Sequence, residues 1–345
     1  MKRLYHQPIC VVVKLATQRP CILLFLVALL LASPSGAVAQ RRYGLNHLVD
    51  SLLSRKYWSA DIDTAYITRP QTRWTVLGRF NLAGARVSAK GIGEGMHFES
   101  EMTANNKSTV SFGVSYLGLA LNMALNPAKM LGKYHDYELT FRSYGKRVGF
   151  DVAYQDASNF KGWQVLDGVR TDFATSDEQF KLRTLNASAY YVFNPRHFSY
   201  SAAFAHSYLQ RRSAGSFLLA LSGQGQHGEL KGDVPVRFKM TNIGIGGGYG
   251  YNYVPGSGWL LHISALPTFI VYTNTSLTMG GTRIPLDYHF PEVIITGRGA
   301  ISKQIGTNKF AGLTMVYYFT NIGDEEKLAI HNEKWLARLF FGFRL

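Results

Sequence analysis

Cysteine is almost missing from this chain of 345 residues. The two cysteines, Cys10 and Cys21, both fall within the first 40 residues. If that stretch is removed after export, disulfides, thiolate catalysis and cysteine-based metal sites are excluded from the rest of the chain. A cysteine-free chain suits a protein that crosses an oxidising compartment unfolded.

Long apolar runs are missing after the start of the chain. An apolar run from Cys21 to Ala32 is preceded by four basic residues and followed by the small-x-small pattern Ala37-Val38-Ala39. This pattern predicts a signal peptide over residues 1 to 39. An uncleaved anchor is the alternative, but the run is short of the roughly 20 residues that a helical span needs. No later stretch reaches that length, so helical spans are excluded after the signal.

Acidic residues and metal-ligand spacings are also scarce. The formal charge is +15, and loss of the four basic residues Lys2, Arg3, Lys14 and Arg19 with the signal would leave +11. The basic residues are scattered, so a basic lumen, or loops that face anionic lipopolysaccharide, is favoured over nucleic-acid binding. The histidines are dispersed, and no helix follows the glycine-rich stretch of residues 244 to 250. No cofactor, metal site or nucleic-acid partner is therefore predicted.

The last twelve residues are the most informative stretch. Trp335, Ala337, Leu339, Phe341, Phe343 and Leu345 share one face of a predicted strand; Leu336, Arg338, Phe340, Gly342 and Arg344 share the other. Period-two alternation with one bulky apolar face is expected of a strand between lipid and a wet lumen. We expect this strand to pair with the strand near Trp74, and to be the part of the chain that outer-membrane assembly machinery recognises.

Similar alternation continues back to residue 73. Short turns are predicted at residues 105 to 107, 145 to 147, 194 to 197, 254 to 258 and 304 to 308, alternating with long loops at 157 to 178, 223 to 238, 274 to 290 and 321 to 333. This asymmetry is typical of bacterial outer-membrane barrels. The fold class predicted is all-β: an antiparallel, transmembrane up-and-down β-barrel of about 12 strands, within a range of about 10 to 14.

The strand count depends on two irregular places. A slip of phase after Tyr116 is interpreted as a β-bulge within one strand. Tyr200, Ala202, Phe204, His206 and Tyr208 alternate in even phase. If residues 211 to 215 are a bulge, one long strand covers residues 198 to 222 and the count is even, as bacterial barrels require; a hairpin there would make it odd.

Three segments are therefore predicted: a signal peptide over residues 1 to 39, a periplasmic N-terminal segment over 40 to 72, and the barrel over 73 to 345. Leu45, Leu48, Val49, Leu52 and Leu53 follow helical spacing, which predicts a short amphipathic helix over residues 44 to 56. It could cap the periplasmic mouth or enter the lumen, or the segment could be mobile.

Several motifs resemble the DUF4421 family of outer-membrane barrel proteins of Bacteroidetes-type bacteria. They are Tyr66-Ile67-Thr68-Arg69-Pro70, the stretch from Gly113 to Leu121, Asn126-Pro127, Phe198-Ser199-Tyr200 and the stretch from Arg212 to Ser216. The resemblance covers roughly residues 57 to 345. It implies the fold and the outer membrane of a Gram-negative bacterium as the location, and it supplies no activity and no catalytic residues.

The candidate site residues are those expected to line the lumen: Glu138, Arg142, Asp151, Gly244, Gly246, Gly248, Gly250, Arg298, Arg338 and Arg344. Inward acids and arginines most often form networks that hold a small barrel together. The glycine stripe either admits a ligand or plug close to the backbone or marks a bend. His206 and Ser207 are adjacent on a predicted strand, so they point to opposite faces and do not indicate a hydrolase.

The primary hypothesis is a non-enzymatic barrel that passes or binds small, preferably anionic, solutes. The alternative is a plugged structural or interaction barrel, and a lipid hydrolase is the third reading. A hydrolase would require a histidine and a hydroxyl on one strand face near the outer rim of the barrel. Outer-membrane lipid and lipopolysaccharide are the expected surroundings, and the oligomeric state is left open.

Overall fold

The computed structural model describes residues 62–345, apart from residues 71, 73, 94–95, 105–106, 117–118, 126–137, 159, 167, 176–178, 232–234, 280, 286–290 and 325–327. The chain divides into two compact units, Met1–Arg55 and Lys56–Leu345, and the described residues belong to the second. The predicted signal peptide and the predicted helix at residues 44 to 56 lie outside the described residues. In the part of the chain that is described, no helix is long and apolar enough to span a membrane.

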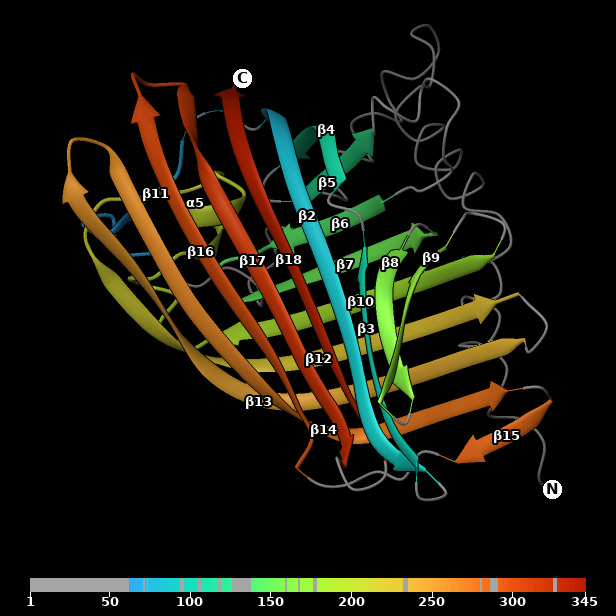
Figure 1. Cartoon of the computed structure of the whole chain (residues 1–345). Helices are drawn as coiled ribbons and strands as arrows, with labels where there is room; N and C mark the ends of the chain where they lie inside the picture. Colours follow the sequence, from blue (N-terminus) through green and yellow to red (C-terminus); the bar gives the residue numbers. More distant parts are fainter. Residues whose placement is uncertain are drawn as a thin grey trace, which may run out of the picture. The chain divides into compact units, whose positions relative to one another are not determined.

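The second unit is built almost entirely of antiparallel strands (Figure 1), which confirms the all-β prediction. They are β1 (Ile67–Thr68), β2 (Trp74–Gly93), β3 (Met96–Ala104), β4 (Lys107–Tyr116), β5 (Leu119–Leu125), β6 (Glu138–Tyr144), β7 (Val148–Ala157), β8 (Phe160–Leu166), β9 (Val169–Ala174), β10 (Phe180–Val192), β11 (Leu209–Gln210), β12 (Ala214–Leu230), β13 (Val236–Gly256), β14 (Trp259–Met279), β15 (Thr282–Pro285), β16 (Val293–Ile305), β17 (Lys309–Asp324) and β18 (Leu328–Arg344). One short helix, α5 (Tyr200–Phe204), interrupts them.

The large sheet follows the order β18-β17-β16-β14-β13-β12-β10-β7-β6-β5-β4-β2-β3-β8-β9, with β15 paired to β14. An additional pairing joins β18 to β2, from Leu328 opposite Gly91 to Arg344 opposite Thr75. The predicted partnership between the last strand and the strand near Trp74 is therefore present. Backbone hydrogen bonds in both directions between Trp74 and Leu345 extend it to the last residue.

The predicted turn at residues 105 to 107 is wrong. β3 and β4 both run antiparallel to β2 and follow one another along it: β3 pairs with residues 86 to 93, and β4 with residues 74 to 83. The chain therefore keeps its direction there. The register with β2 shifts by one residue between β3 and β4, as it does at a bulge.

The bulge predicted after Tyr116 is also wrong, because the chain turns back there and does not continue in one strand. Tyr116 of β4 pairs with Leu119 of β5, so the chain reverses across residues 117 to 118. A two-residue reversal shifts the apolar phase in the same way as a bulge. The alternation of side chains therefore could not distinguish a bulge from a tight turn. One error adds a strand and the other removes one, so the predicted number of strands is unaffected.

Several loops predicted from polar sequence are strand instead. β12 continues to Leu230, β17 continues to Asp324, and β8 and β9 form a hairpin inside the predicted 157–178 loop. Ladder hydrogen bonds come from the backbone, so strands with polar side chains on both faces still pair. By contrast, the short connections after Tyr144, Gly256 and Ile305 lie where turns were predicted, with Gly258 and Gly306 at positive φ. The end of the sheet with these turns is called the turn side, and the opposite end the loop side.

The two faces of the sheet differ sharply. Large apolar side chains at alternate positions are exposed, among them Phe217 at 71 %, Ile263 at 70 % and Leu339 at 60 %. The residues between them are buried and mostly small, polar or charged, such as Ser264 and Arg338. Apolar residues are therefore outside and polar residues inside, the reverse of the distribution in a water-soluble sheet protein.

Candidate functional site

The segment from Asn194 to Ser213, called the inner segment below, joins β10 to β12 and includes α5 and β11. Residues 198 to 208 were predicted as strand, and that prediction is wrong. The Ser199 side chain accepts a hydrogen bond from the backbone N–H of Ala202 and caps α5. Ser201, Ala202 and Ala203 are buried together with Phe198 and Tyr200. Because small residues fill the odd positions, the stretch from residue 198 to residue 206 is buried on both faces and not on one.

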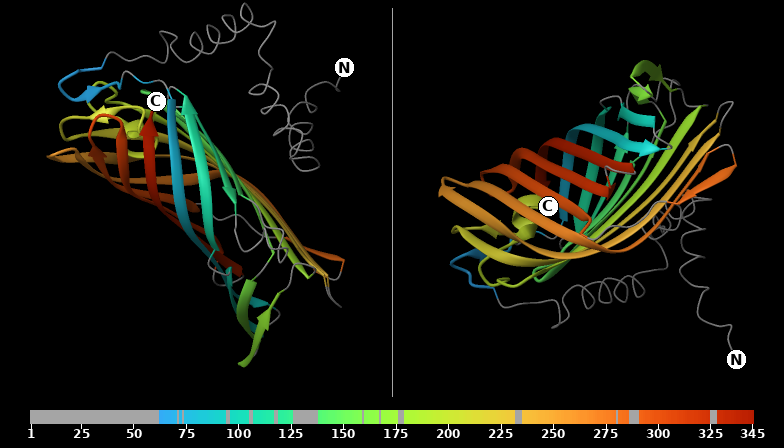
Figure 2. Two further views of the ribbon diagram at one scale, coloured as in Figure 1. Left: turned by 90° about the horizontal axis from the view of Figure 1, so that it is seen from above. Right: turned by 60° about the horizontal axis from the view of Figure 1, so that its bottom comes forward.

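Tyr200 shows where the inner segment lies. Its ring is 4.6 Å from that of Tyr190 on β10 and 6.4 Å from that of Tyr144 on β6, measured between centroids. Its hydroxyl lies 2.7 Å from Ser264 Oγ on β14, and the Arg298 guanidinium of β16 lies 5.6 Å from its ring. β6 and β16 are far apart in the sheet order, so a side chain that contacts both lies within the curve of the sheet. Figure 2 (right) shows α5 among the strands.

A chain of hydrogen bonds joins Tyr200 to the wall and back to the inner segment. Ser264 Oγ lies 3.0 Å from His262 Nε2, and His262 Nδ1 lies 2.7 Å from Asn252 Oδ1. The Asn252 amide donates to the Ser199 carbonyl at 2.9 Å and to Gln210 Oε1 at 3.0 Å. Gln210 Oε1 also accepts from the Ser199 backbone N–H. The network thus ties the helix cap to β13 and β14.

The hydrogen-bonded series Ser264, His262 and Asn252 matches the nucleophile, base and orienting amide of a hydrolase triad in residue type. His262 and Ser264 lie two residues apart on β14, so they share a face, and Asn252 is the register partner of His262. These residues, which sequence analysis missed, meet the requirement for one shared strand face, but they lie near the β13–β14 turn and not near the outer rim. All three are buried, and Ser264 already contacts Tyr200. The signal that could have found them is a His-x-Ser pair on one strand.

An ion-pair cluster lies next to Tyr200. Arg298 Nη2 is 3.0 Å from Asp151 Oδ2, and Arg142 Nε is 3.2 Å from Asp151 Oδ1. The Tyr144 hydroxyl donates to Asp151 Oδ1 at 2.8 Å. The Arg298 side chain is 3 % exposed, and its Nε and Nη1 have no hydrogen-bond partner among the described residues. The structure therefore brings together three of the residues named from the sequence, with two guanidinium groups around one carboxylate.

Arg344 and Arg338 lie elsewhere on β18. Arg344 Nε donates to the His206 carbonyl at 2.8 Å, and its Nη1 donates to Gln304 Oε1 at 2.6 Å. Arg338 is buried at 6 % exposure, and the side chain of Glu138 lies outside the described residues. Arg344 therefore holds the inner segment to the last strand.

His206 belongs to the inner segment and not to a strand, which corrects its predicted position. Its ring packs 4.3 Å from Phe310 and 4.6 Å from Phe340, measured between centroids. Burial lowers the pKa of His206 well below its ordinary value, and the positive charges of Arg344 and Arg79 add to the effect. The imidazole is therefore neutral. The neighbouring Ser207 hydroxyl contacts Ser201.

The glycine stripe on β13 has two separate causes. A Cβ on Gly246 would meet the Pro267 carbonyl at 2.0 Å, and one on Gly248 would meet the Ala265 carbonyl at 1.9 Å, so β13 and β14 approach closely there. A Cβ on Gly250 would lie 3.0 Å from Phe198 of the inner segment. Gly244 is less crowded, with the Phe269 carbonyl at 3.1 Å. Close strand packing and room for the inner segment account for the stripe. The second cause corresponds to the plug among the predicted alternatives, whereas the first was not predicted.

Residues 62–70 cover the inner segment on the turn side. β1 pairs with β11, and the Asp63 backbone N–H donates to the Arg196 carbonyl. The Tyr66 ring lies 4.3 Å from that of His197, measured between centroids, and Ile67 is fully buried. This end of the predicted N-terminal segment therefore adds a second layer over the inner segment.

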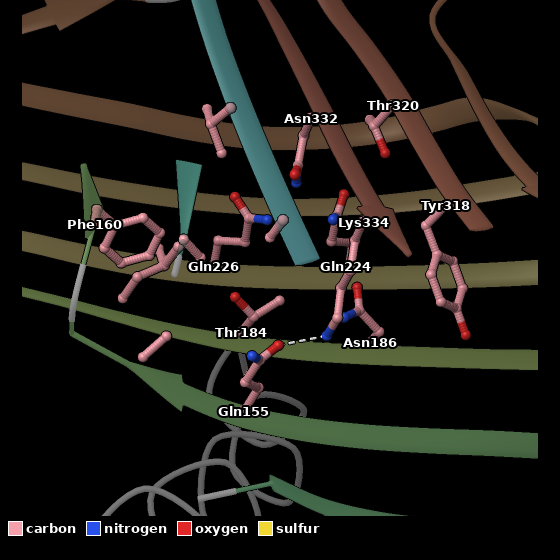
Figure 3. A pocket seen from close by; sticks show the side chains of 15 residues that line it. Gln155, Phe160, Thr184, Asn186, Gln224, Gln226, Tyr318, Thr320, Asn332 and Lys334 are labelled. Carbon is pink, nitrogen blue, oxygen red and sulfur yellow. Dashed lines mark hydrogen bonds between the residues drawn. The ribbon is translucent and has the colours of Figure 1, made fainter. Parts of the chain in front are cut away.

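A polar hollow lies toward the loop side of the ion-pair cluster (Figure 3). Gln155, Thr184, Asn186, Gln224, Gln226, Tyr318, Thr320, Asn332 and Lys334 line it from facing strands. Its volume is about 40 Å³. A buried water needs at least about 10 to 15 Å³ measured this way, so the hollow has room for a few waters. Across the described residues, no group of three His, Cys, Asp or Glu is placed to hold a metal ion.

Comparison with known proteins gives one family and several solved structures. The family model described as "Domain of unknown function (DUF4421)" matches residues 61–345. No match was found among curated proteins. The outer membrane protease OmpT from Escherichia coli is similar with a TM-score of 0.45 and 8 % identity, covering 80 % of this chain and 97 % of that one. The outer membrane protein OprG from Pseudomonas aeruginosa is similar with a TM-score of 0.30 and 10 % identity, covering 82 % and 99 %.

Proposed function

The chain belongs to the DUF4421 family, and we propose that it is an outer-membrane β-barrel whose lumen is closed on the turn side by its own inner segment. Binding or interaction at the barrel surfaces is then its function, and free passage is not. This is the plugged form weighed from the sequence. The main observation in support of a closed lumen is that Tyr200 contacts β6, β10, β14 and β16 at the same time.

Strand pairing supports a closed barrel. β2, β4, β5, β6, β7, β10, β12, β13, β14, β16, β17 and β18 are each paired with the next, and β18 is paired with β2. We propose that these twelve strands form the ring. β3, β8 and β9 extend it on the loop side (Figure 2, left), away from α5. An even number of antiparallel strands is expected of a bacterial single-chain barrel.

The exposed face supports the membrane location. Trp74, Trp259 and Phe343 are exposed at the turn end of their strands, and aliphatic side chains such as Ile263 and Leu313 are exposed further along the strands. An apolar band with aromatic residues at its border is the pattern of a lipid-facing surface. We propose the outer membrane of a Gram-negative bacterium, with lipid and lipopolysaccharide as surroundings and the assembly machinery as the partner of β18.

The second candidate function is passage of small anions. The observation that favours it is the excess of buried arginines over buried carboxylates among the described residues: Arg79, Arg298, Arg338 and Arg344 against Asp151 and Glu292. Passage would require the inner segment to move, because its aromatic side chains pack against both walls. The two candidates therefore differ in whether the resting barrel conducts.

Planar-bilayer recording separates them. The wild-type barrel should show no steady conductance, and a variant with residues 197 to 211 replaced by a short Gly/Ser connection should conduct. A matched control removes the β8–β9 hairpin on the loop side and should stay silent. Each variant is first checked for heat-modifiable mobility, which reports a folded barrel. Steady, anion-selective conductance of the wild type would favour passage instead.

A further inference from the structure

The largest hollow described at the turn side lies between the inner segment and the β13–β14 and β16–β17 turns. This mouth pocket has a volume of about 350 Å³, which is in the range of small-molecule sites. Its lining includes Ala202, Tyr208, Arg211, Trp259, Lys303 and Arg344. The polar hollow of Figure 3 is much smaller, so the mouth pocket is the place where this barrel has room for a ligand.

Positive charge dominates the mouth pocket. Arg211, Lys303 and Arg344 line it from three different elements, and none of the residues that line it is acidic. Arg211 Nε donates to Thr68 Oγ1, while Lys303 Nζ donates to the Ser257 carbonyl. Among the described residues, no carboxylate pairs with any of these three cations. Clustered cations without a counter-charge are favourable for an anion and costly without one.

Apolar side chains also line the pocket. Leu209, Leu260 and Phe310 lie beside the cations, and Leu260 and Phe310 are buried on the inner face. Trp259 is 42 % exposed on the lipid-facing side, and Lys303 Nζ lies 5.0 Å from the centroid of its ring. Trp at the border of an apolar band marks the level of lipid headgroups, and basic pockets at that level bind anionic headgroups.

We propose that the mouth pocket binds the phosphate group of an anionic phospholipid, with Lys303 and Arg211 as the phosphate ligands and the exposed Trp259 beside the lipid's glycerol and upper acyl groups. The proposal that the pocket lies at the level of a membrane leaflet rests on the proposed outer-membrane function. The proposal that it binds phosphate does not depend on that function, because the cations and the cavity belong to the folded chain. Arg344 has a structural role here, since it holds the inner segment.

Native mass spectrometry of the folded protein, released from an uncharged detergent, tests the site. The probes are phosphatidylglycerol, phosphatidylcholine and inorganic phosphate. The wild type should retain one phosphatidylglycerol in preference to phosphatidylcholine. A Lys303→Gln/Arg211→Gln double variant should lose about tenfold in affinity, equivalent to about 1.4 kcal/mol. The control Arg196→Gln changes an exposed residue of the inner segment that does not line the pocket, and should bind as the wild type does.

The outcomes are separable. Equal phosphatidylglycerol retention by the wild type and a folded double variant would overturn the site. Variant-sensitive binding of inorganic phosphate, with no added affinity for lipid, would support the phosphate site but assign a soluble anion as its source. The bilayer recording above is independent, because a barrel that conducts can still hold a phosphate at its mouth, and a silent barrel can lack one.

Discussion

The two ends of the interior are built from the same strands but filled in opposite ways. On the turn side, Phe198, Tyr200 and His206 from the inner segment pack against aromatic rings of the wall. On the loop side, amides and hydroxyls, together with Phe160, Leu182 and smaller apolar residues, line a hollow. The difference shows that the alternation of a barrel strand specifies only that a residue faces inward. What it meets there depends on a segment that belongs to no strand.

The largest effect is expected from deletion of Phe343 to Leu345. The deletion removes the exposed Phe343 and Leu345 and the Arg344 contact with the inner segment, so both lipid-facing and inward anchors of the turn side are lost. We expect no assembled barrel in outer membranes, measured as heat-modifiable protein. The control on the loop side, removal of the β8–β9 hairpin, should assemble. Assembly of the truncated chain would show that the turn side does not depend on its last strand.

Asp151→Ala should give the next largest effect. It leaves Arg142 and Arg298 buried without their shared carboxylate, and breaking a buried ion pair costs about 3 to 5 kcal/mol. The measurement is the free energy of unfolding in urea, from vesicles. The control Asp172→Ala breaks an exposed pair with Arg170 on the loop side and should change it by less than about 1 kcal/mol. Equal effects would mean that the cluster does not support the closed end.

Acid should weaken the turn side through His206. The folded pKa is depressed, so the unfolded chain binds the extra proton once the pH falls below about 6.5. Stability is then fully present above that pH and falls by about 1.4 kcal/mol per pH unit below it. His206→Gln should reduce this slope in urea unfolding at pH 5 to 7. An unchanged slope would place the acid sensitivity elsewhere.

The smallest effect concerns Tyr200 and Ser264. Tyr200→Phe and Ser264→Ala each remove one buried hydrogen-bond partner, and each should lower the free energy of unfolding by about 1 kcal/mol. Because the two changes remove the same contact, the loss of unfolding free energy in the double variant should be smaller than the sum of the two single losses.

The wild type should not react with a fluorophosphonate probe. Labelling that Ser264→Ala abolishes would instead make Ser264, His262 and Asn252 a catalytic group.

Sequence by itself determined the strand class, the exposed apolar face and the turns after Tyr144, Gly256 and Ile305. These are local properties: a strand exposes alternate side chains, and a tight turn needs residues such as Gly258 and Gly306 that tolerate positive φ. The motifs that resembled DUF4421 also identified the family correctly. Asp151, Arg142 and Arg298 could be named, but not paired, because their contact depends on how strands distant in the sequence lie together.

Only the tertiary structure decided the conformation and position of residues 194 to 213. Their even-phase pattern is equally compatible with a strand and with a short helix that is buried on all sides, because burial all round removes the distinction between two faces. Ser199 before a run rich in alanine was a local helix signal. Its outcome depended on the room beside Gly250 and on the facing walls that supply Tyr144, Tyr190 and Ser264. Those walls exist only once the strands have paired, so the position of this segment was decided by packing and not by local sequence.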